Sequence, residues 1–139
     1  MDEALLDTDT LSEIIKGKNA SVAARASAYR AIHHRYTFSV FTALEIMKGY
    51  HRVRRPDRIS RFLAGIAGEQ ILTFGVSTAE LSGRIIADLE LSGRPIGRID
   101  PMIAAVALEH GLTVVTGNVA HYQHIQRLGY PLTLDDWRA

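Results

Sequence analysis

Three acidic residues occur where the chain passes between apolar segments, and together they suggest metal-assisted hydrolysis. They are Asp7, Glu45 and Asp100. Carboxylates that cluster repel one another and raise one another's pKa, so such a group usually needs a cation or a shared proton. Mg²⁺ prefers carboxylate oxygens and suits one or two of them together with a substrate phosphate. A site of this kind can activate water and hold a phosphodiester for in-line displacement.

The segment that must position Asp100 runs from Gly97 to Asn118. Asp100 followed by Pro101 is typical of a helix start, because Asp is a favoured N-cap and Pro is tolerated at the first helical position. Residues 102–110 are apolar almost all round, which predicts a buried helix ending at Gly111. A short buried strand is expected over 112–115, with a polar turn after it.

The remaining segments alternate between strand and helix patterns. Strands are expected at 4–6, 36–41, 71–74 and 132–134, and helices at 10–17, 21–34, from 42 to beyond 47, 57–66, 77–91 and 119–128. This alternation predicts an α/β fold with a central, mainly parallel sheet flanked by helices. We expect one domain over residues 1–139. Because parallel strands end at one edge of a sheet, Asp7, Glu45, Asp100, Thr116 and Asn118 are expected to converge there.

Local helix capping offers a second interpretation of several of these polar residues. Thr42–Glu45 and Thr10–Glu13 both match the capping-box pattern, so Glu45 is explained equally well as a cap. Asp100 is a good N-cap, and Asn118 suits the start of the helix that follows. Asp7 is different, because secondary-structure propensity does not explain a carboxylate directly after a buried strand. Capping and metal binding are compatible, since a helix N-terminus favours a carboxylate.

Composition excludes several other classes of site. The 139 residues contain no cysteine, which rules out disulfides, thiolate zinc sites and cysteine nucleophiles. The formal net charge is only +1, but six of the sixteen Lys and Arg lie between Lys48 and Arg61. This basic stretch either contacts an RNA backbone or forms a solvated pair of helices. The beginning of the chain does not resemble a signal peptide, and no apolar run is long enough for a membrane span, so a cytoplasmic protein is expected.

Four motifs resemble those of PIN-domain ribonucleases in order and spacing. They are Leu5–Asp9, Thr42–Glu45, Asp100–Ala105 and Val115–Asn118. The chain is similar to VapC-type toxins of bacterial toxin–antitoxin pairs over essentially its whole length, including Asp136–Trp137. The resemblance implies an endoribonuclease that depends on Mg²⁺ or Mn²⁺, a homodimer held by helices, and a cognate antitoxin that blocks the site.

The resemblance also implies roles for individual residues. Asp7, Glu45 and Asp100 match the acidic residues that hold the metal, while Thr116 and Asn118 match the polar positions that orient groups by hydrogen bonding. Two positions depart from the common pattern. Asp9 stands where Asn is common, and Gly117 stands where a larger, often basic residue is frequent.

Two other functions remain open at this stage. Asp7–Thr10 also resembles the Asp-x-Asp-x-Thr start of haloacid-dehalogenase-type phosphatases, in which Asp7 is the nucleophile and Asp9 the acid and base. A nucleic-acid-binding module with a degenerate site is the third hypothesis. His121 and His124 are three residues apart on an expected helix, but no third ligand accompanies them, so a zinc site there is disfavoured.

Overall fold

The computed structural model describes residues 1–139 as seven α-helices, one short 3₁₀ helix and five short strands. The helices are α1 (Thr8–Lys16), α2 (Ala20–His33), α3 (Val40–Arg52), α4 (Pro56–Gly65), η1 (Ile66–Gly68), α5 (Val76–Leu91), α6 (Ile99–His110) and α7 (Val119–Arg127). The strands are β1 (Ala4–Leu6), β2 (Thr37–Ser39), β3 (Gln70–Leu72), β4 (Thr113–Val115) and β5 (Leu134–Asp135).

Every strand pairing is parallel. β4 pairs with β1 on one side and β5 on the other, with Leu5 opposite Val114. β2 pairs with β3, and β2 also lies beside β1. The strands thus form a three-stranded and a two-stranded parallel sheet, which meet where β1 lies beside β2. The predicted α/β fold with a parallel sheet is confirmed.

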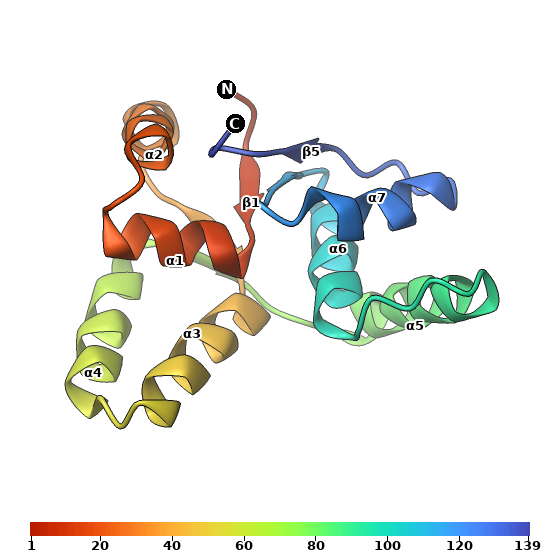
Figure 1. Cartoon of the computed structure of the whole chain (residues 1–139), viewed down its shortest axis with the longest axis horizontal. Helices are drawn as coiled ribbons and strands as arrows, with labels where there is room; N and C mark the ends of the chain where they lie inside the picture. Colours follow the sequence, from red (N-terminus) through yellow and green to blue (C-terminus); the bar gives the residue numbers. More distant parts are fainter.

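The helices form two groups, one on each side of β1 (Figure 1). α1 to α4 pack around one core cluster, which includes Phe38 and Trp137. α5, α6 and α7 pack around a second, which includes Leu5, Ile103 and Tyr122. The α6 helix is buried along most of its length, as its apolar sequence predicts, and Gly111 ends it with a left-handed φ of 63°.

The first helix begins earlier than its sequence pattern predicts. α1 starts at Thr8, and Asp7 is its N-cap, accepting a hydrogen bond from the Thr8 backbone N–H at 2.8 Å. The predicted capping box at Thr10 is wrong. The Thr10 hydroxyl instead donates to the Val115 carbonyl oxygen at 3.1 Å, a contact with a residue 105 positions away.

The third helix also begins earlier, which changes the interpretation of Glu45. The strand predicted to reach residue 41 ends at Ser39, and the Ser39 hydroxyl caps α3 by accepting from the Thr42 N–H at 3.3 Å. Glu45 therefore lies in the second turn of α3, and its predicted role in a capping box is wrong. Its carboxylate is available for contacts outside the helix.

Asp100 does not cap α6. The helix begins at Ile99 with Arg98 at the N-cap position, which places Asp100 in the first turn. A carboxylate there still benefits from the positive end of the helix dipole. Asn118 does occupy the N-cap position of α7, but its side chain makes no capping hydrogen bond. None of the helices is both long enough and apolar enough to cross a membrane.

Candidate functional site

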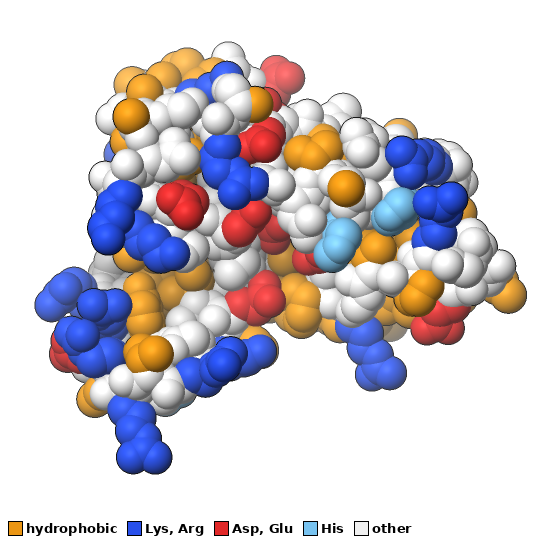
Figure 2. Space-filling model, viewed as in Figure 1, with side chains coloured by type: hydrophobic (Ala, Val, Ile, Leu, Met, Phe, Trp, Pro, Cys, Tyr) orange, Lys and Arg blue, Asp and Glu red, His pale blue; other side chains and the backbone are white.

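A cleft of about 1310 Å³ opens at the carboxyl ends of the strands. Its walls come mainly from α1, α3 and α4, and Asp7, Asp9, Glu45, Asp100 and Asn118 all line it. The space-filling view shows acidic side chains in the middle of this face, with Lys and Arg mostly towards its margins (Figure 2). The sheet edge thus brings together the three acids that the sequence singled out.

Asp7 is the most buried carboxylate of the cleft, with 5% of its surface exposed. One oxygen accepts from the Thr8 N–H, and the other accepts from the Thr116 hydroxyl at 2.8 Å. The backbone N–H of Asp7 donates to the Val115 carbonyl at 2.9 Å, which extends the pairing of β1 with β4. The carboxylate is therefore fixed between the ends of two adjacent strands.

Burial raises the pKa of Asp7 to about 7. The nearby carboxylates of Asp9 and Asp100 raise it further, while the hydrogen bonds from Thr116 and from the Thr8 backbone oppose that rise. At neutral pH the Asp7 carboxyl group of the metal-free protein is therefore only partly ionised. A bound cation would change this by favouring the charged form.

Thr116 links Asp7 to the turn after β4. It is fully buried, and its oxygen accepts from the Asn118 backbone N–H at 2.9 Å while its hydroxyl donates to Asp7. Asp9 braces the same turn from α1, because its carboxylate accepts from the Gly117 N–H at 2.9 Å. The turn is thus tied both to Asp7, the N-cap of α1, and to Asp9 in its first turn.

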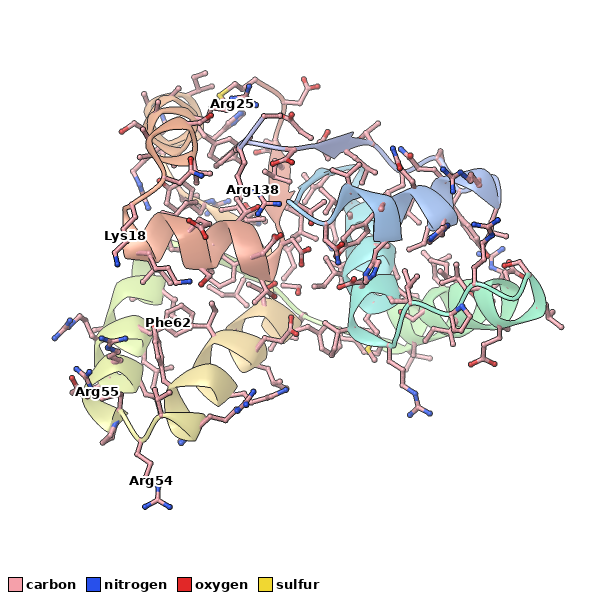
Figure 3. The ribbon with its side chains drawn as sticks, viewed as in Figure 1. Lys18, Arg25, Arg54, Arg55, Phe62 and Arg138 are labelled. Atoms are coloured by element: carbon pink, nitrogen blue, oxygen red, sulfur yellow. The ribbon has the colours of Figure 1, made fainter.

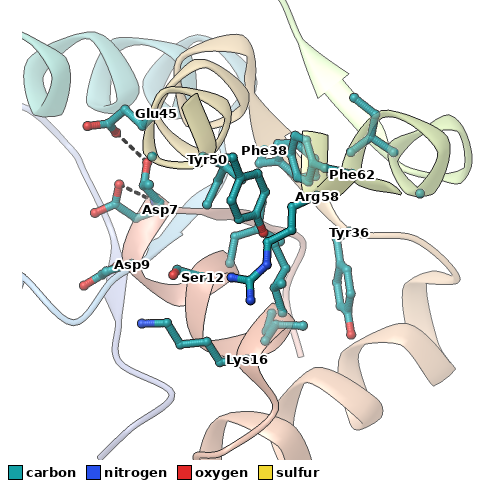
Figure 4. A pocket seen from close by; sticks show the side chains of 18 of the residues that line it. Asp7, Asp9, Ser12, Lys16, Tyr36, Phe38, Glu45, Tyr50, Arg58 and Phe62 are labelled. Carbon is teal, nitrogen blue, oxygen red and sulfur yellow. Dashed lines mark hydrogen bonds between the residues drawn. The ribbon is translucent and has the colours of Figure 1, made fainter. Parts of the chain in front are cut away.

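Glu45 reaches the cleft from α3. Its carboxylate accepts a hydrogen bond from the Thr8 hydroxyl, whose oxygen is 3.2 Å from that of Thr42 (Figure 4). Glu45 is half-buried, so part of its carboxylate faces the cleft. This contact joins α3 to the first residue of α1, directly beside Asp7.

Asp100 is held by two residues of α7 that the sequence analysis did not assign to the site. The His121 Nδ1 lies 2.9 Å from one oxygen of Asp100, and the buried Tyr122 hydroxyl lies 3.5 Å from the other. Asn118 approaches the same imidazole, with its amide nitrogen 2.8 Å from Nδ1. The position of Asn118 after a strand was visible in the sequence, whereas the side chains facing Asp100 follow only from the packing of α7 on α6.

The family model for the PIN domain matches residues 4–125. The chain belongs to the PIN-domain family. A tRNA(fMet)-specific endonuclease VapC of Shigella flexneri is 30% identical over 134 residues, which are 96% of each chain.

Solved structures give the same result for the fold. DNA-bound VapBC from Salmonella typhimurium contains a chain with a TM-score of 0.80 and 29% identity, covering 99% of both chains. VapBC-1 from nontypeable Haemophilus influenzae gives a TM-score of 0.81 at 25% identity over 98% of both. The PIN-domain fold therefore extends over the whole of this chain.

The carboxylates of this PIN domain share one cleft without forming a compact ligand cage. No three Asp, Glu or His side chains stand close enough together to make a ready-made set of metal ligands. Such an arrangement fits Mg²⁺, which usually keeps several of its waters and takes one or two carboxylates directly. The buried Asp7, with its raised pKa, is the group with most to gain from such an ion.

The other end of the cleft has a different character. Lys16, Arg58 and Tyr50 line it, with the apolar side chains of α1 and α4 beneath them (Figure 4). Of the six Lys and Arg residues between Lys48 and Arg61, only Arg58 and Arg61 line the cleft. The His pair predicted on α7 is divided, since His121 faces Asp100 and His124 lies 3.3 Å from an Arg127 nitrogen.

Proposed function

We propose that this chain is an endoribonuclease that depends on Mg²⁺ or Mn²⁺. The observation that carries the proposal is the convergence of Asp7, Glu45 and Asp100 on one cleft of a PIN domain. The identity to a tRNA(fMet)-specific endonuclease over 96% of the chain supports RNA as the substrate. An enzyme that acts on cellular RNA is also expected to work in the cytoplasm.

Asp7 and Asp100 would hold the metal, directly or through its waters. When bound, the ion supplies positive charge that polarises the scissile phosphate and lowers the pKa of water. The chain's own contribution is to fix the two carboxylates. Thr116 and the Thr8 N–H orient Asp7, while His121 and Tyr122 orient Asp100.

Glu45 is the residue placed to accept a proton from the attacking water, or to help hold the ion. It is less buried than Asp7, and a single hydroxyl, that of Thr8, anchors it. Thr116 and Asn118 keep the turn after β4 in place and orient the groups around Asp7 by hydrogen bonding.

We also propose that the chain is the toxin of a type II toxin–antitoxin pair. Solved structures similar to this chain include VapBC complexes, and its relatives include VapC ribonucleases. A cognate antitoxin would block the cleft. Arginine is the residue best suited to this, because its guanidinium binds a carboxylate through two hydrogen bonds, and the apolar wall of the cleft would take neighbouring apolar side chains.

A homodimer is part of the same proposal. Several apolar side chains lie exposed outside the cleft, including Val40 and Leu44 on one face of α3 and Val76 at the start of α5. Val40 and Leu44 are four residues apart and so share a helix face. Light scattering of the purified protein tests this point, and introducing Asp at Leu44 should convert a dimer to a monomer.

The decisive experiment for the activity is RNA cleavage by the purified chain, freed of any partner. A tRNA(fMet) transcript and a panel of other structured RNAs would be incubated with Mg²⁺ or Mn²⁺, with EDTA, or with the variants Asp7→Asn and Asp100→Asn. We expect cleavage that needs the metal and that each variant abolishes. Glu80→Gln on the exposed face of α5 removes one negative charge outside the cleft and should cleave as the parent does.

Two results would overturn the proposal. If the folded protein cleaves no RNA but hydrolyses a small phosphomonoester such as p-nitrophenyl phosphate, the phosphatase hypothesis based on Asp7 and Asp9 gains support. If it binds metal and RNA without any turnover, the chain is a binding module. The family assignment favours the nuclease over both.

A further inference from the structure

Arg138 lies over a glycine of the candidate site. A Cβ atom built on Gly117 would stand 1.6 Å from an Nη of Arg138 and 2.0 Å from its Cζ, and the three nearest heavy atoms all belong to this one side chain. The guanidinium therefore occupies the space that a side chain at position 117 would fill. Figure 3 shows Arg138 between α1 and the beginning of α7.

Position 117 needs a glycine because the Arg138 side chain occupies the space beside it, and not because of its backbone conformation. Gly117 is absent from the residues with positive φ, so its conformation is one that any residue can adopt. Its N–H donates to Asp9, a bond that does not depend on the absence of a side chain. Gly117 and Arg138 thus form a matched pair, 21 positions apart, in which one residue makes room for the other.

The backbone that carries Arg138 is firmly attached to the fold. Trp137 is 1% exposed in the core beside α2, and its carbonyl accepts from the Ser21 hydroxyl at 2.7 Å. The Asp136 carbonyl accepts from Arg25 at 3.0 Å, and the Arg138 N–H donates to the Asp136 carboxylate at 2.9 Å. These contacts direct the Arg138 side chain towards the turn after β4.

Besides its ion pair with Asp136, the guanidinium has donors available for an anion. Its side chain is 43% exposed and makes no hydrogen bond within the protein. Its nearest carboxylate partner is Asp136, 3.6 Å from Nε, and it forms no ion pair with Asp9. Directly beneath it, residues 116 and 117 bind Asp7 and Asp9. Arg138 does not itself line the cleft, but its unused donors lie over Gly117, next to Asn118, which does.

We infer that Arg138 binds a phosphate of the RNA substrate beside the site of cleavage. The inference rests on the proposed nuclease function. RNA must bring its phosphates up to several carboxylates, and a positive charge at the rim offsets that repulsion. A guanidinium offers several donors in a planar fork that matches phosphate oxygens. Arg138 is thus a substrate-positioning residue, and it contacts the backbone of RNA of any sequence.

The first test compares Arg138→Ala with Arg94→Ala, which removes the same charge from an exposed loop outside the cleft. The readouts are kcat and KM for cleavage of a labelled tRNA(fMet) transcript in Mg²⁺, and the affinity for the same RNA in EDTA over a range of salt concentrations. For Arg138→Ala we expect KM and Kd to rise roughly tenfold and the salt dependence of log K to fall by about 0.7 to 0.9. We expect kcat to change less than about twofold, and Arg94→Ala to match the parent.

The second test moves the cation to the glycine. Arg138→Ala vacates the space over Gly117, so adding Gly117→Arg places a guanidinium on the same turn from another part of the chain. This double variant should recover most of the lost RNA affinity. Gly117→Ala alone should displace the flexible Arg138 side chain and produce a smaller rise in KM, with the thermal stability of the protein little changed.

The outcomes separate this inference from the proposed function. If the parent cleaves RNA and Arg138→Ala has an unchanged KM and salt dependence, the role of Arg138 is refuted while the nuclease stands. A loss of stability without a change in KM would make Arg138 a structural residue only, and it too would refute the inference. If the parent neither binds nor cleaves any RNA, both proposals fail together.

Discussion

The two ends of the cleft are built in opposite ways. At the acidic end, Asp7, Asp9 and Asp100 are each held by hydrogen bonds from other segments of the chain, and Asp7 is almost fully buried. At the other end, the exposed side chains of Lys16 and Arg58 project from α1 and α4 without a hydrogen bond to the protein. Both ends belong to one continuous cavity.

This difference points to a division of labour. Groups that act on the reacting atoms must be held in place in advance, because positioning supplies much of the rate enhancement. Groups that only attract a flexible polyanion can remain mobile and solvated. Substitutions of Asp7, Glu45 or Asp100 should therefore reduce kcat, and substitutions of the exposed Lys16 and Arg58 should raise KM.

Apart from Asp7→Asn and Asp100→Asn, the largest effect is expected from Glu45→Gln. Glutamine keeps an oxygen that can accept from the Thr8 hydroxyl but has no negative charge and cannot accept a proton. We expect kcat for RNA cleavage to fall by about 10²- to 10³-fold, with KM nearly unchanged. A large rise in KM with a normal kcat would show that Glu45 binds RNA. It would contradict the expected difference between the acidic residues and the basic residues of the cleft.

The next largest effect is expected on the stability of the metal-free protein, which removal of the Asp7 charge should increase. Because burial raises the pKa of Asp7 to about 7, the folded protein is favoured by protonation of this group. The stabilisation of the folded protein by protonated Asp7 is complete below pH 3.8, the pKa of this group in the unfolded chain. It is lost as the pH rises through about 7, the pKa of Asp7 in the folded protein. The charged group then destabilises the metal-free protein by at most about 4 kcal/mol.

Asp7→Asn should therefore stabilise the metal-free protein at high pH. The measurement is the Tm in EDTA at pH 8 and at pH 5. We expect the variant to exceed the parent by several degrees at pH 8 and by less at pH 5. Added Mg²⁺ should raise the Tm of the parent only. A variant less stable than the parent at both pH values would show that Asp7 is held mainly by its hydrogen bonds.

A smaller effect is expected at the basic end. Arg58→Ala removes an exposed charge that faces the cleft, and α4 should tolerate it because alanine is a strong helix former. RNA affinity should fall by about threefold to tenfold for all sequences alike, with kcat unchanged. Filter binding at two salt concentrations checks this, with Arg84→Ala on α5 as the matched control outside the cleft. An equal loss in both variants would indicate an effect of total charge.

The smallest effect is expected from Asp9→Asn, which tests how finely the acidic end is tuned. Asparagine can still accept from the Gly117 N–H, but it removes one of the charges that raise the pKa of Asp7. The pH at which Mg²⁺ begins to stabilise the protein should therefore move downward, while the cleavage rate at pH 8 changes less than about threefold. An upward shift would contradict the electrostatic account of Asp7.

The sequence was most informative where one segment determined the result. The apolar run 4–6 predicted β1 and so placed Asp7 at the end of a strand, and the apolar segment after Pro101 predicted the buried α6 with Gly111 at its end. The parallel sheet then followed from the order of the elements. These features predicted that Asp7, Glu45 and Asp100 share one edge, which the structure confirms.

The sequence was least informative where a side chain bonds to a distant part of the chain. Thr10 fits a capping box, but its hydroxyl serves Val115. Val40 and Phe41 have the β-branched and aromatic character of a strand, yet Ser39 starts a helix there. The contacts of His121 and Tyr122 with Asp100, and of Arg138 with Gly117, depend on packing that no local pattern encodes.

The pairing of β1 with β4 has a consequence for how the chain is made. Asp7 is synthesised more than a hundred residues before its partners Val115 and Thr116. Until then the first carboxylate has neither its strand neighbour nor its hydroxyl. A nascent chain therefore cannot assemble the candidate site until β4 and the turn after it have been synthesised.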